Sequence, residues 1–325
     1  MKARLQFFLK IAFAAVLIYF LIHNGFLKLD SLKALLTVQS IAIGFLFIGA
    51  NLWLLNWRWY WLLRSRGFNV TLGQTYALYL IGVFFNHALP SSVGGDVVKA
   101  YYIANEQKHR RVESVLSVLI DRVLGLYTLL LLSLISVLFD FNFVMSNPEI
   151  KWMAMLCGLL TIGMSVCLII GFSSRLDRWL HITSTLKKLP VLHKLAHVFE
   201  AMQLFGKQKS AILASIFISC IGQMLSVLFV MYVGSVLGAH LSFATYLFCV
   251  PLGFVATALP VAPAGVGVGQ VAFLFLFKTY SPESGDLGAA AITTFQLAML
   301  SWGVIGSIFY IRYRSPALEA AAQNA

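Results

Sequence analysis

The sequence predicts an all-α polytopic membrane protein, and three observations support that fold class. The 325-residue chain is 60% hydrophobic and 11% charged, which leaves too little charge to cover a surface exposed to water. Several apolar runs reach the roughly 18–20 residues that a helix needs to cross about 30 Å of hydrocarbon. These runs lack strand-like alternation, so they indicate helices rather than the strands of a membrane barrel. We expect one transmembrane domain over residues 1–325.

Six long spans account for most of the apolar sequence. They are expected at about 5–23, 40–62, 114–139, 152–172, 210–238 and 289–311. The first follows a basic start and is similar to a secretory signal peptide. No clear small-x-small cleavage site follows it, so a retained signal anchor is favoured.

Two further apolar segments are interrupted by proline. One covers 74–104 and is broken at Pro90, and the other covers 242–280 and is broken at Pro260 and Pro263. As a helix, the arm before Pro90 would rise only about 24 Å, which is too short to cross the membrane comfortably. Neither segment is therefore expected to be a simple span.

Positive charge sets the expected orientation, because cytoplasmic loops are enriched in Lys and Arg. Both termini carry such residues and belong in the cytoplasm: Lys2, Arg4, Lys10, Arg312 and Arg314. The basic stretches 58–66, 105–113 and 173–209 belong on the same side. Segment 74–104 must then enter and leave from the cytoplasm, and segment 242–280 from outside, as two re-entrant helical hairpins.

This topology predicts an inverted repeat. Span, hairpin and span follow one another over 40–139 and again, with opposite orientation, over 210–311. Both breaks share Ala-Leu-Pro and following glycines, although that triplet could also recur by chance in a chain rich in Ala and Leu. Many transporters use broken helices in inverted repeats to build a binding site near the membrane midplane.

The net charge of +12 fits the basic loops and attraction to anionic lipid, so no nucleic-acid partner is expected. Stretch 173–209 carries seven Lys or Arg against two acids and predicts a basic cytoplasmic loop with an amphipathic surface helix. His193 and His197 lie four residues apart there, but "HKLAH" lacks the glutamate of a zinc protease motif. We expect neither a metal nor a cofactor.

The two breaks offer the first candidate binding residues. Helix ends broken at membrane depth expose N–H groups that lipid cannot satisfy, and such ends suit an anion such as phosphate. Close helix packing explains the glycines equally well. The candidates are Asn86, Ser91, Ser92, Gly94, Gly95 and Asp96 at the first break, and Pro263, Gly265, Gly267 and Gln270 at the second.

Asp121 and Arg122 add ionisable groups about eight residues into the 114–139 span, where charges usually face a partner or a cavity. Helical geometry turns their side chains roughly 100° apart, so they need not pair with one another. Arg122 is expected to pair with Asp96 or to meet a lipid phosphate. A structural ion pair that holds the bundle together is the alternative.

Other charged and polar residues are interpreted as structural. Lys99 is expected to reach the cytoplasmic interface, and Arg58 to lie there beside several tryptophans. Small polar residues along the 210–238 span indicate helix–helix contact more than a transport pathway: Ser215, Ser219, Gly222 and Ser226.

Three sequence stretches resemble a known family. They are "NHALPSSVGGDVVKAYYI", "LIDRVLGL" and "LPVAPAGVGVGQ", and they look like motifs of the lysylphosphatidylglycerol synthase membrane region. The resemblance spans nearly the whole chain. It implies a polytopic fold of the bacterial inner membrane, with re-entrant hairpins, that moves lipids between leaflets.

The family motifs map onto residues of this chain. Its acid after paired glycines, its Asp-Arg pair and its Pro-x-Gly-x-Gly turn correspond to Asp96, to Asp121 and Arg122, and to Pro263, Gly265 and Gly267. Gln270 stands where relatives often carry glutamate. The aminoacyl-transferase domain of bifunctional members has no counterpart in this sequence, so synthesis of a lysyl-lipid is not implied.

These features favour a flippase-like transporter of a phospholipid or another phosphate-bearing lipid, with the headgroup held between the hairpin tips. Asp96 and Asp121 would either balance Arg122 or contact a cationic headgroup. One alternative is a membrane transferase acting on a lipid-linked donor, for which Asp96 is the only candidate general base. The other is a non-transporting envelope accessory protein. Membrane lipids are the expected partners, and no enzymatic activity is expected.

Overall fold

The computed structural model describes residues 33–89, 91–180 and 193–313, together with positions 19, 23 and 183. Within these residues there are helices and no strands, and five helices are long and apolar enough to cross a membrane. These are α3 (Val38–Ser65), α6 (Arg111–Ser136), α8 (Pro148–Phe172), α12 (Lys209–Val236) and α15 (Gly285–Arg312). The predicted all-α polytopic fold is confirmed. The predicted span 5–23 lies outside the described residues.

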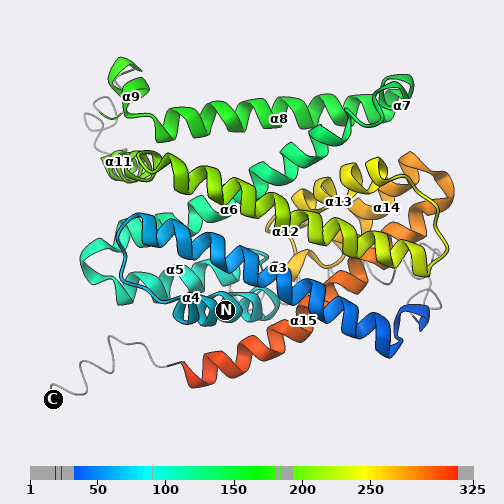
Figure 1. The fold of residues 1–325 in the computed structure, drawn as a ribbon, viewed down its shortest axis with the longest axis horizontal. Coiled ribbons are helices and arrows are strands. Elements are labelled where there is room, and N and C mark those ends of the chain that lie inside the picture. Colours follow the sequence, from blue (N-terminus) through cyan, green and yellow to red (C-terminus); the bar gives the residue numbers. More distant parts are fainter. Residues whose placement is uncertain are drawn as a thin grey trace.

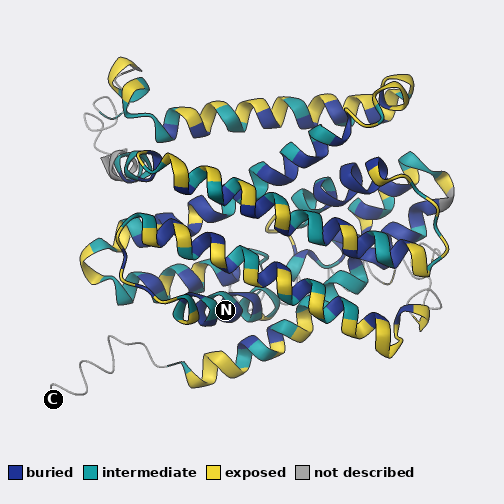
Figure 2. Cartoon of the chain, viewed as in Figure 1, coloured by how far each residue is buried: buried dark blue, intermediate teal, exposed yellow. Residues whose placement is uncertain are grey.

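The long helices run roughly side by side along the longest dimension of the molecule (Figure 1). Helix α12 packs along α3, and α6 contacts both. Helix α8 is peripheral: it packs against α6 and is joined to it by the short α7 (Phe141–Ser146). Its outer face exposes large apolar side chains (Figure 2), including Trp152 at 69%, Leu159 at 67% and Ile162 at 63%. A continuous apolar exterior of this kind suits lipid rather than water.

Each proline-interrupted segment is a pair of short helices in contact with one another. The first pair is α4 (Leu72–Ala88) and α5 (Gly94–Glu106), and the second is α13 (Phe243–Thr257) and α14 (Val268–Tyr280). In Figure 1 the two pairs lie toward opposite ends of the long helices. Pro90 itself lies outside the described residues.

The first helix of each pair starts at a hydroxyl cap. Thr71 Oγ1 accepts from the Gln74 N–H at 3.2 Å, and Ser242 Oγ accepts from the Thr245 N–H at 3.2 Å. Such caps satisfy N–H groups that have no partner inside the helix. The two pairs therefore begin in the same local way.

Glycine lets the short helices approach closely. A Cβ at Gly95 would lie 1.9 Å from the Gly82 carbonyl oxygen, so α4 and α5 touch backbone to backbone. A Cβ at Gly306 would lie 2.1 Å from the Leu80 carbonyl oxygen, which fixes α15 against α4. At the first break, the packing interpretation of Gly95 therefore holds.

The turn of the second pair is built differently. A 3₁₀ turn, η2 (Pro263–Gly265), precedes α14, and the chain takes positive φ at Ala264 (48°), Gly265 (69°) and Gly267 (84°). Glycine adopts this left-handed backbone without the steric penalty of a side chain. The glycines of "GVGVG" therefore shape this turn.

The predicted basic loop 173–209 contains α9 (Ser174–Leu180) and α11 (His193–Gly206), with part of the loop outside the described residues. Helix α11 has an apolar face, as expected, with Ala201 and Phe205 buried. That face packs against α6 and α8 instead of lipid. The side chains of His193 and His197 lie outside the described part.

Candidate functional site: a cavity at the meeting point of the two helix pairs

A cavity of about 290 Å³ lies where the turns of the two helix pairs meet. The Ser92 hydroxyl, in the first turn, lies 3.2 Å from the Ala258 carbonyl oxygen and 3.1 Å from that of Leu259, in the second. One part of the wall is apolar and includes Leu126, Leu129, Phe254, Phe295 and Met299. The other part is charged and includes Arg58, Asp96, Asp121 and Arg122.

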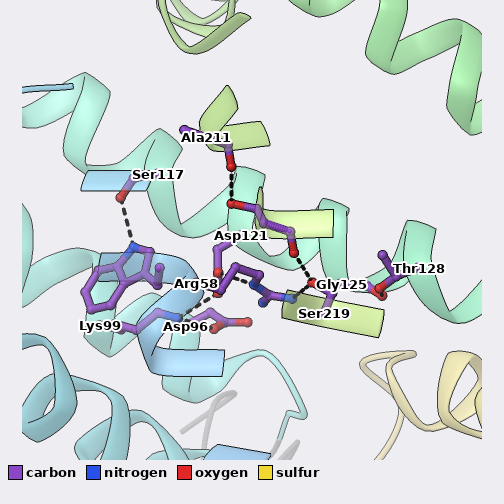
Figure 3. A network of polar contacts seen from close by, with 11 residues as sticks. Arg58, Asp96, Lys99, Ser117, Asp121, Gly125, Thr128, Ala211 and Ser219 are labelled. Carbon is purple, nitrogen blue, oxygen red and sulfur yellow. Dashed lines mark hydrogen bonds and ion pairs between the residues drawn. The ribbon is translucent and has the colours of Figure 1, made fainter. Parts of the chain in front are cut away.

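The deepest ion pair joins Arg58 of α3 to Asp121 of α6. Arg58 Nε lies 2.7 Å from Asp121 Oδ1, and Arg58 Nη1 donates to Ser219 Oγ of α12 at 2.7 Å (Figure 3). Arg58 is 3% exposed and Asp121 is 2% exposed. The prediction that Arg58 lies at the interface is therefore wrong. Its guanidinium turns into the bundle, where a carboxylate and a hydroxyl compensate for the lost hydration.

Lys99 of α5 lies between the two carboxylates. Its Nζ is 3.5 Å from Asp121 Oδ2 and 3.6 Å from Asp96 Oδ1. The same ammonium lies 4.7 Å from the ring centroid of Trp59 and 4.6 Å from that of Tyr79, which are cation–π distances. Lys99 is 3% exposed, so its predicted reach to the interface is wrong. Two carboxylates and two aromatic faces hold it inside the protein.

Arg122 forms the outer ion pair, with Asp96. Arg122 Nη1 lies 2.5 Å from Asp96 Oδ2, and Nη2 donates to the Ala258 carbonyl at 3.0 Å. Of the two partners expected for Arg122, Asp96 or a lipid phosphate, the structure shows the pair with Asp96, and the side chain of Arg122 does not pair with Asp121. Both side chains are 23% exposed, so this pair is the accessible part of the network. Arg122 also ties α6 to the turn of the second helix pair.

The network carries an excess of one positive charge. It contains three cations (Arg58, Lys99 and Arg122) and two carboxylates (Asp96 and Asp121), and 3 − 2 leaves +1. All four carboxylate oxygens already face a cation. Both aspartates are therefore paired with cations of the site, which leaves no unpaired carboxylate among these five residues for a cationic headgroup.

The first turn does not present the open N–H cradle that the sequence suggested. At the first break, the N–H groups of Gly94 and Gly95 donate to the Ser91 carbonyl (3.1 Å) and to Asn86 Oδ1 (2.8 Å), and that of Asp96 donates to the Val93 carbonyl (3.1 Å). These bonds within the turn occupy the donors. An anion in the cavity would therefore meet side chains rather than these N–H groups.

Gln270 is part of the second turn and lies behind the cavity wall. It is 1% exposed, and its Oε1 accepts from the Gly267 N–H at 2.7 Å. Its Nε2 donates to Thr293 Oγ1 at 3.1 Å and to Gln296 Oε1 at 2.7 Å. The amide oxygen of Gln270 thus binds the turn, and its NH₂ group binds α15. A carboxylate at this position could not make the bonds to α15, because it has no N–H donor.

The predicted site residues divide into two groups. Those that line the cavity are Asn86, Ser92, Asp96, Asp121 and Arg122. The others belong to the two turns and do not line the cavity: Ser91, Gly94, Gly95, Pro263, Gly265, Gly267 and Gln270.

Sequence reasoning missed Arg58 and Lys99 as members of the site. Two signals pointed to them: Arg58 falls inside the predicted span 40–62, and Lys99 follows Asp96 by three residues, on the same helical face. In the described part of the chain, no group of three or more His, Cys, Asp or Glu is placed to hold a metal ion.

Long apolar helices, two broken helix pairs and a cavity lined partly by charged side chains define a polytopic α-helical membrane protein with a candidate polar site between its helices. The family model described as lysylphosphatidylglycerol synthase TM region matches residues 7–314, so the chain belongs to that family. Membership confirms the resemblance found in the sequence and indicates a function related to membrane lipids. No curated protein and no solved structure matches the chain.

Proposed function

We propose that the protein translocates a phosphate-bearing lipid between the leaflets of the bacterial inner membrane. The observation that carries this proposal is the cavity between the two helix-pair turns, bordered by a charged network with an excess of one positive charge and lined by the partly exposed Arg122–Asp96 pair. A headgroup phosphate would meet Arg122 there, while the acyl chains stay in lipid. Guanidinium is well suited to phosphate because its N–H groups can bind two oxygens at once.

In this proposal the helix pairs α4–α5 and α13–α14 are re-entrant hairpins from opposite membrane faces, in inverted repeats over 40–139 and 210–311. One end of the bundle gathers basic residues where α3 ends and α6 begins. There Arg66 pairs with Glu113 at 3.1 Å, and Arg110 Nη1 donates to the Arg66 carbonyl at 2.8 Å. By the positive-inside rule this basic end, with both termini, faces the cytoplasm.

Alternating access would require the two turns to separate. Ser92 of the first turn donates to the Ala258 and Leu259 carbonyls of the second, and Arg122 ties α6 to the second turn through the Ala258 carbonyl. Rocking of one repeat against the other would break and remake these few hydrogen bonds, opening the cavity first to one face and then to the other. The sequence shows no nucleotide-binding motif, so a gradient or downhill exchange would drive the movement.

Two alternatives receive less support. A transferase would need a general base, but both oxygens of Asp96 are held in ion pairs, so we also propose that the protein is not an enzyme. A non-transporting accessory protein would need no cavity between the turns, whereas a cavity lined by charged and apolar side chains lies there.

Reconstitution in liposomes tests the proposal. Leaflet exchange of a fluorescent phospholipid, followed by dithionite quenching, should be faster with the protein than in empty vesicles. Arg122→Ala should slow exchange by about tenfold or more, because the headgroup phosphate loses the guanidinium that would bind it. Arg111→Ala is the matched control, since Arg111 lies on the same helix and is exposed.

Thermal unfolding of each variant shows whether slow exchange reflects misfolding. Arg122→Lys, which keeps the charge but not the two-pronged geometry, should be intermediate. Equal exchange rates for wild type, Arg122→Ala and protein-free vesicles would overturn the proposed function.

A further inference from the structure

We propose that Lys99 makes the cavity selective for anionic headgroups, because it retains Asp96 when a headgroup phosphate replaces that carboxylate on Arg122. The inference rests on the proposed function, since it assumes that the cavity holds a lipid headgroup. Beyond the proposed function, it assigns Lys99 as a specificity-determining residue and states that Asp96 exchanges Arg122 for Lys99 as its ion-pair partner when the headgroup binds.

The distances distinguish one shared cation from two closely paired ones. Arg58 and Arg122 lie 2.7 Å and 2.5 Å from their carboxylates. Lys99 lies 3.5 Å and 3.6 Å from two carboxylates, close to both and in tight contact with neither. It can therefore move toward either aspartate.

Asp96 is the carboxylate that an incoming anion can displace. Its pair with Arg122 is 23% exposed on each side and lines the cavity, whereas the side chains of Arg58 and Asp121 are only 4% and 3% exposed. An anion that reaches the cavity meets Arg122 first. Arg122 keeps its bond to the Ala258 carbonyl through Nη2, which leaves Nη1 as the group to be exchanged.

Lys99 removes the main obstacle to this exchange. A carboxylate released inside the bundle would be very unfavourable without a partner. Lys99 is one helical turn from Asp96 on the same helix, and the rings of Trp59 and Tyr79 hold its ammonium from other directions. Asp96 can therefore close on Lys99 as it leaves Arg122, so no charge remains unpaired.

The charge balance then sets the preference. An anionic headgroup neutralises the excess charge of +1 that the three cations and two carboxylates leave. A zwitterionic headgroup brings its own ammonium and leaves the excess in place. Without Lys99 the network is neutral, and Asp96 has no cation except Arg122.

Calorimetric titration of the purified protein in neutral detergent tests the inference without requiring transport. The probes are dihexanoyl-phosphatidylglycerol, which is anionic, and dihexanoyl-phosphatidylcholine, which is zwitterionic. Wild type should prefer the anionic lipid by about tenfold or more, and Lys99→Met should lose that preference. Lys151→Met is the control, since Lys151 is exposed on α8.

A double-mutant cycle separates partner exchange from a merely structural role. Asp96→Asn should bind the anionic lipid more tightly than wild type, because nothing competes for Arg122. The double variant Asp96→Asn/Lys99→Met has the wild-type excess of +1 again and should regain the anionic preference that Lys99→Met lost. If Lys99 only supported the fold, the double variant would bind both lipids at least as poorly as Lys99→Met.

The remaining outcomes are also decisive. Equal binding of both lipids by wild type and Lys99→Met would overturn this inference and leave the proposed function standing. No binding of either lipid by wild type would overturn both. Glycerol phosphate, an anionic headgroup without tails, serves as a further probe. If it binds as tightly as the anionic lipid and responds to Lys99→Met, the inference stands, but the ligand is a soluble phosphate ester.

Discussion

At the scale of single residues, the five charged side chains form two layers with different roles. Arg58 and Asp121 lie in the inner layer, where Ser219 provides a further hydrogen bond. Asp96 and Arg122 lie in the outer layer beside the cavity, and Lys99 joins the layers. We interpret the inner layer as structural and the outer layer as the part that meets a ligand.

The inner layer should contribute strongly to stability. Arg58→Met leaves Asp121 in a buried site without its closest partner, and we expect a loss of about 3–5 kcal/mol. The measurement is thermal or denaturant unfolding in detergent. Arg64→Met, on the exposed side of the same helix, should change stability by less than about 1 kcal/mol. Similar effects of the two substitutions would contradict the structural role of Arg58.

Only three of the five charged residues of the network could be predicted as site residues from the sequence. Asp121 and Arg122 are conspicuous in the sequence because they are charges inside an apolar run, and Asp96 because it follows the paired glycines of the first break. Arg58 lies in the second half of α3 and Lys99 inside the short α5, and from either position a long basic side chain can equally well extend to the interface. Which way they turn depends on helix rotation and on aromatic partners such as Trp59, and one sequence fixes neither.

At the scale of elements, the short helix pairs depend on close backbone contact. Helices α4 and α5 meet at Gly82 and Gly95, and α15 meets α4 at Gly306. The same contacts position Asn86 and Asp96 at the cavity wall and Lys99 next to Asp96. Packing of the pair and geometry of the site are therefore coupled.

Gly95→Ala should separate α4 from α5. Its Cβ would lie 1.9 Å from a backbone oxygen, so one of the two helices must shift, and we expect a loss of about 1–3 kcal/mol. Gly163→Ala on α8 is the control, because a Cβ there meets nothing within 4 Å. It should leave the unfolding temperature unchanged or raise it, since alanine favours helix. An equally stable Gly95→Ala would show that α4 and α5 do not depend on this contact.

The positions of the short helices could largely be predicted from the sequence, whereas the hydrogen-bond partners of the N–H groups in the turns could not. The proline breaks indicated where the short helices end, and α13 and α14 fall within the predicted 242–280. The phosphate-cradle hypothesis failed at the first break because Asn86, eight residues before Gly94, caps the N–H of Gly95. A side-chain cap that reaches across a turn depends on the turn's conformation, which the sequence pattern does not supply.

At the scale of the whole molecule, the two ends of the bundle differ in charge. Arg64, Arg66 and Arg111 lie where α3 ends and α6 begins, and Tyr313 at the end of α15 donates to Glu106 there. The α7 region, where α6 leads into α8, lies at the opposite end (Figure 1). This asymmetry is the physical basis of the orientation that we propose.

Labelling of single cysteines tests that orientation. In a variant with the four native cysteines replaced, a membrane-impermeant maleimide should label Asn142→Cys in intact spheroplasts. It should label Lys108→Cys only in inverted vesicles; both positions are exposed, and they lie toward opposite ends. The opposite pattern would reverse the orientation, and labelling of both from one side would exclude spanning by α6.

The contact between Lys99 and Trp59 also has a spectroscopic consequence. An indole excited state has a larger dipole than its ground state, so a charge near the ring shifts the emission wavelength. The ammonium lies 4.7 Å from the Trp59 ring centroid, and the indole N–H is anchored to Ser117 Oγ at 3.1 Å. If Lys99 moves toward Asp96 as proposed, the emission maximum of Trp59 should shift, and a variant that keeps only this one of the seven tryptophans would report the movement.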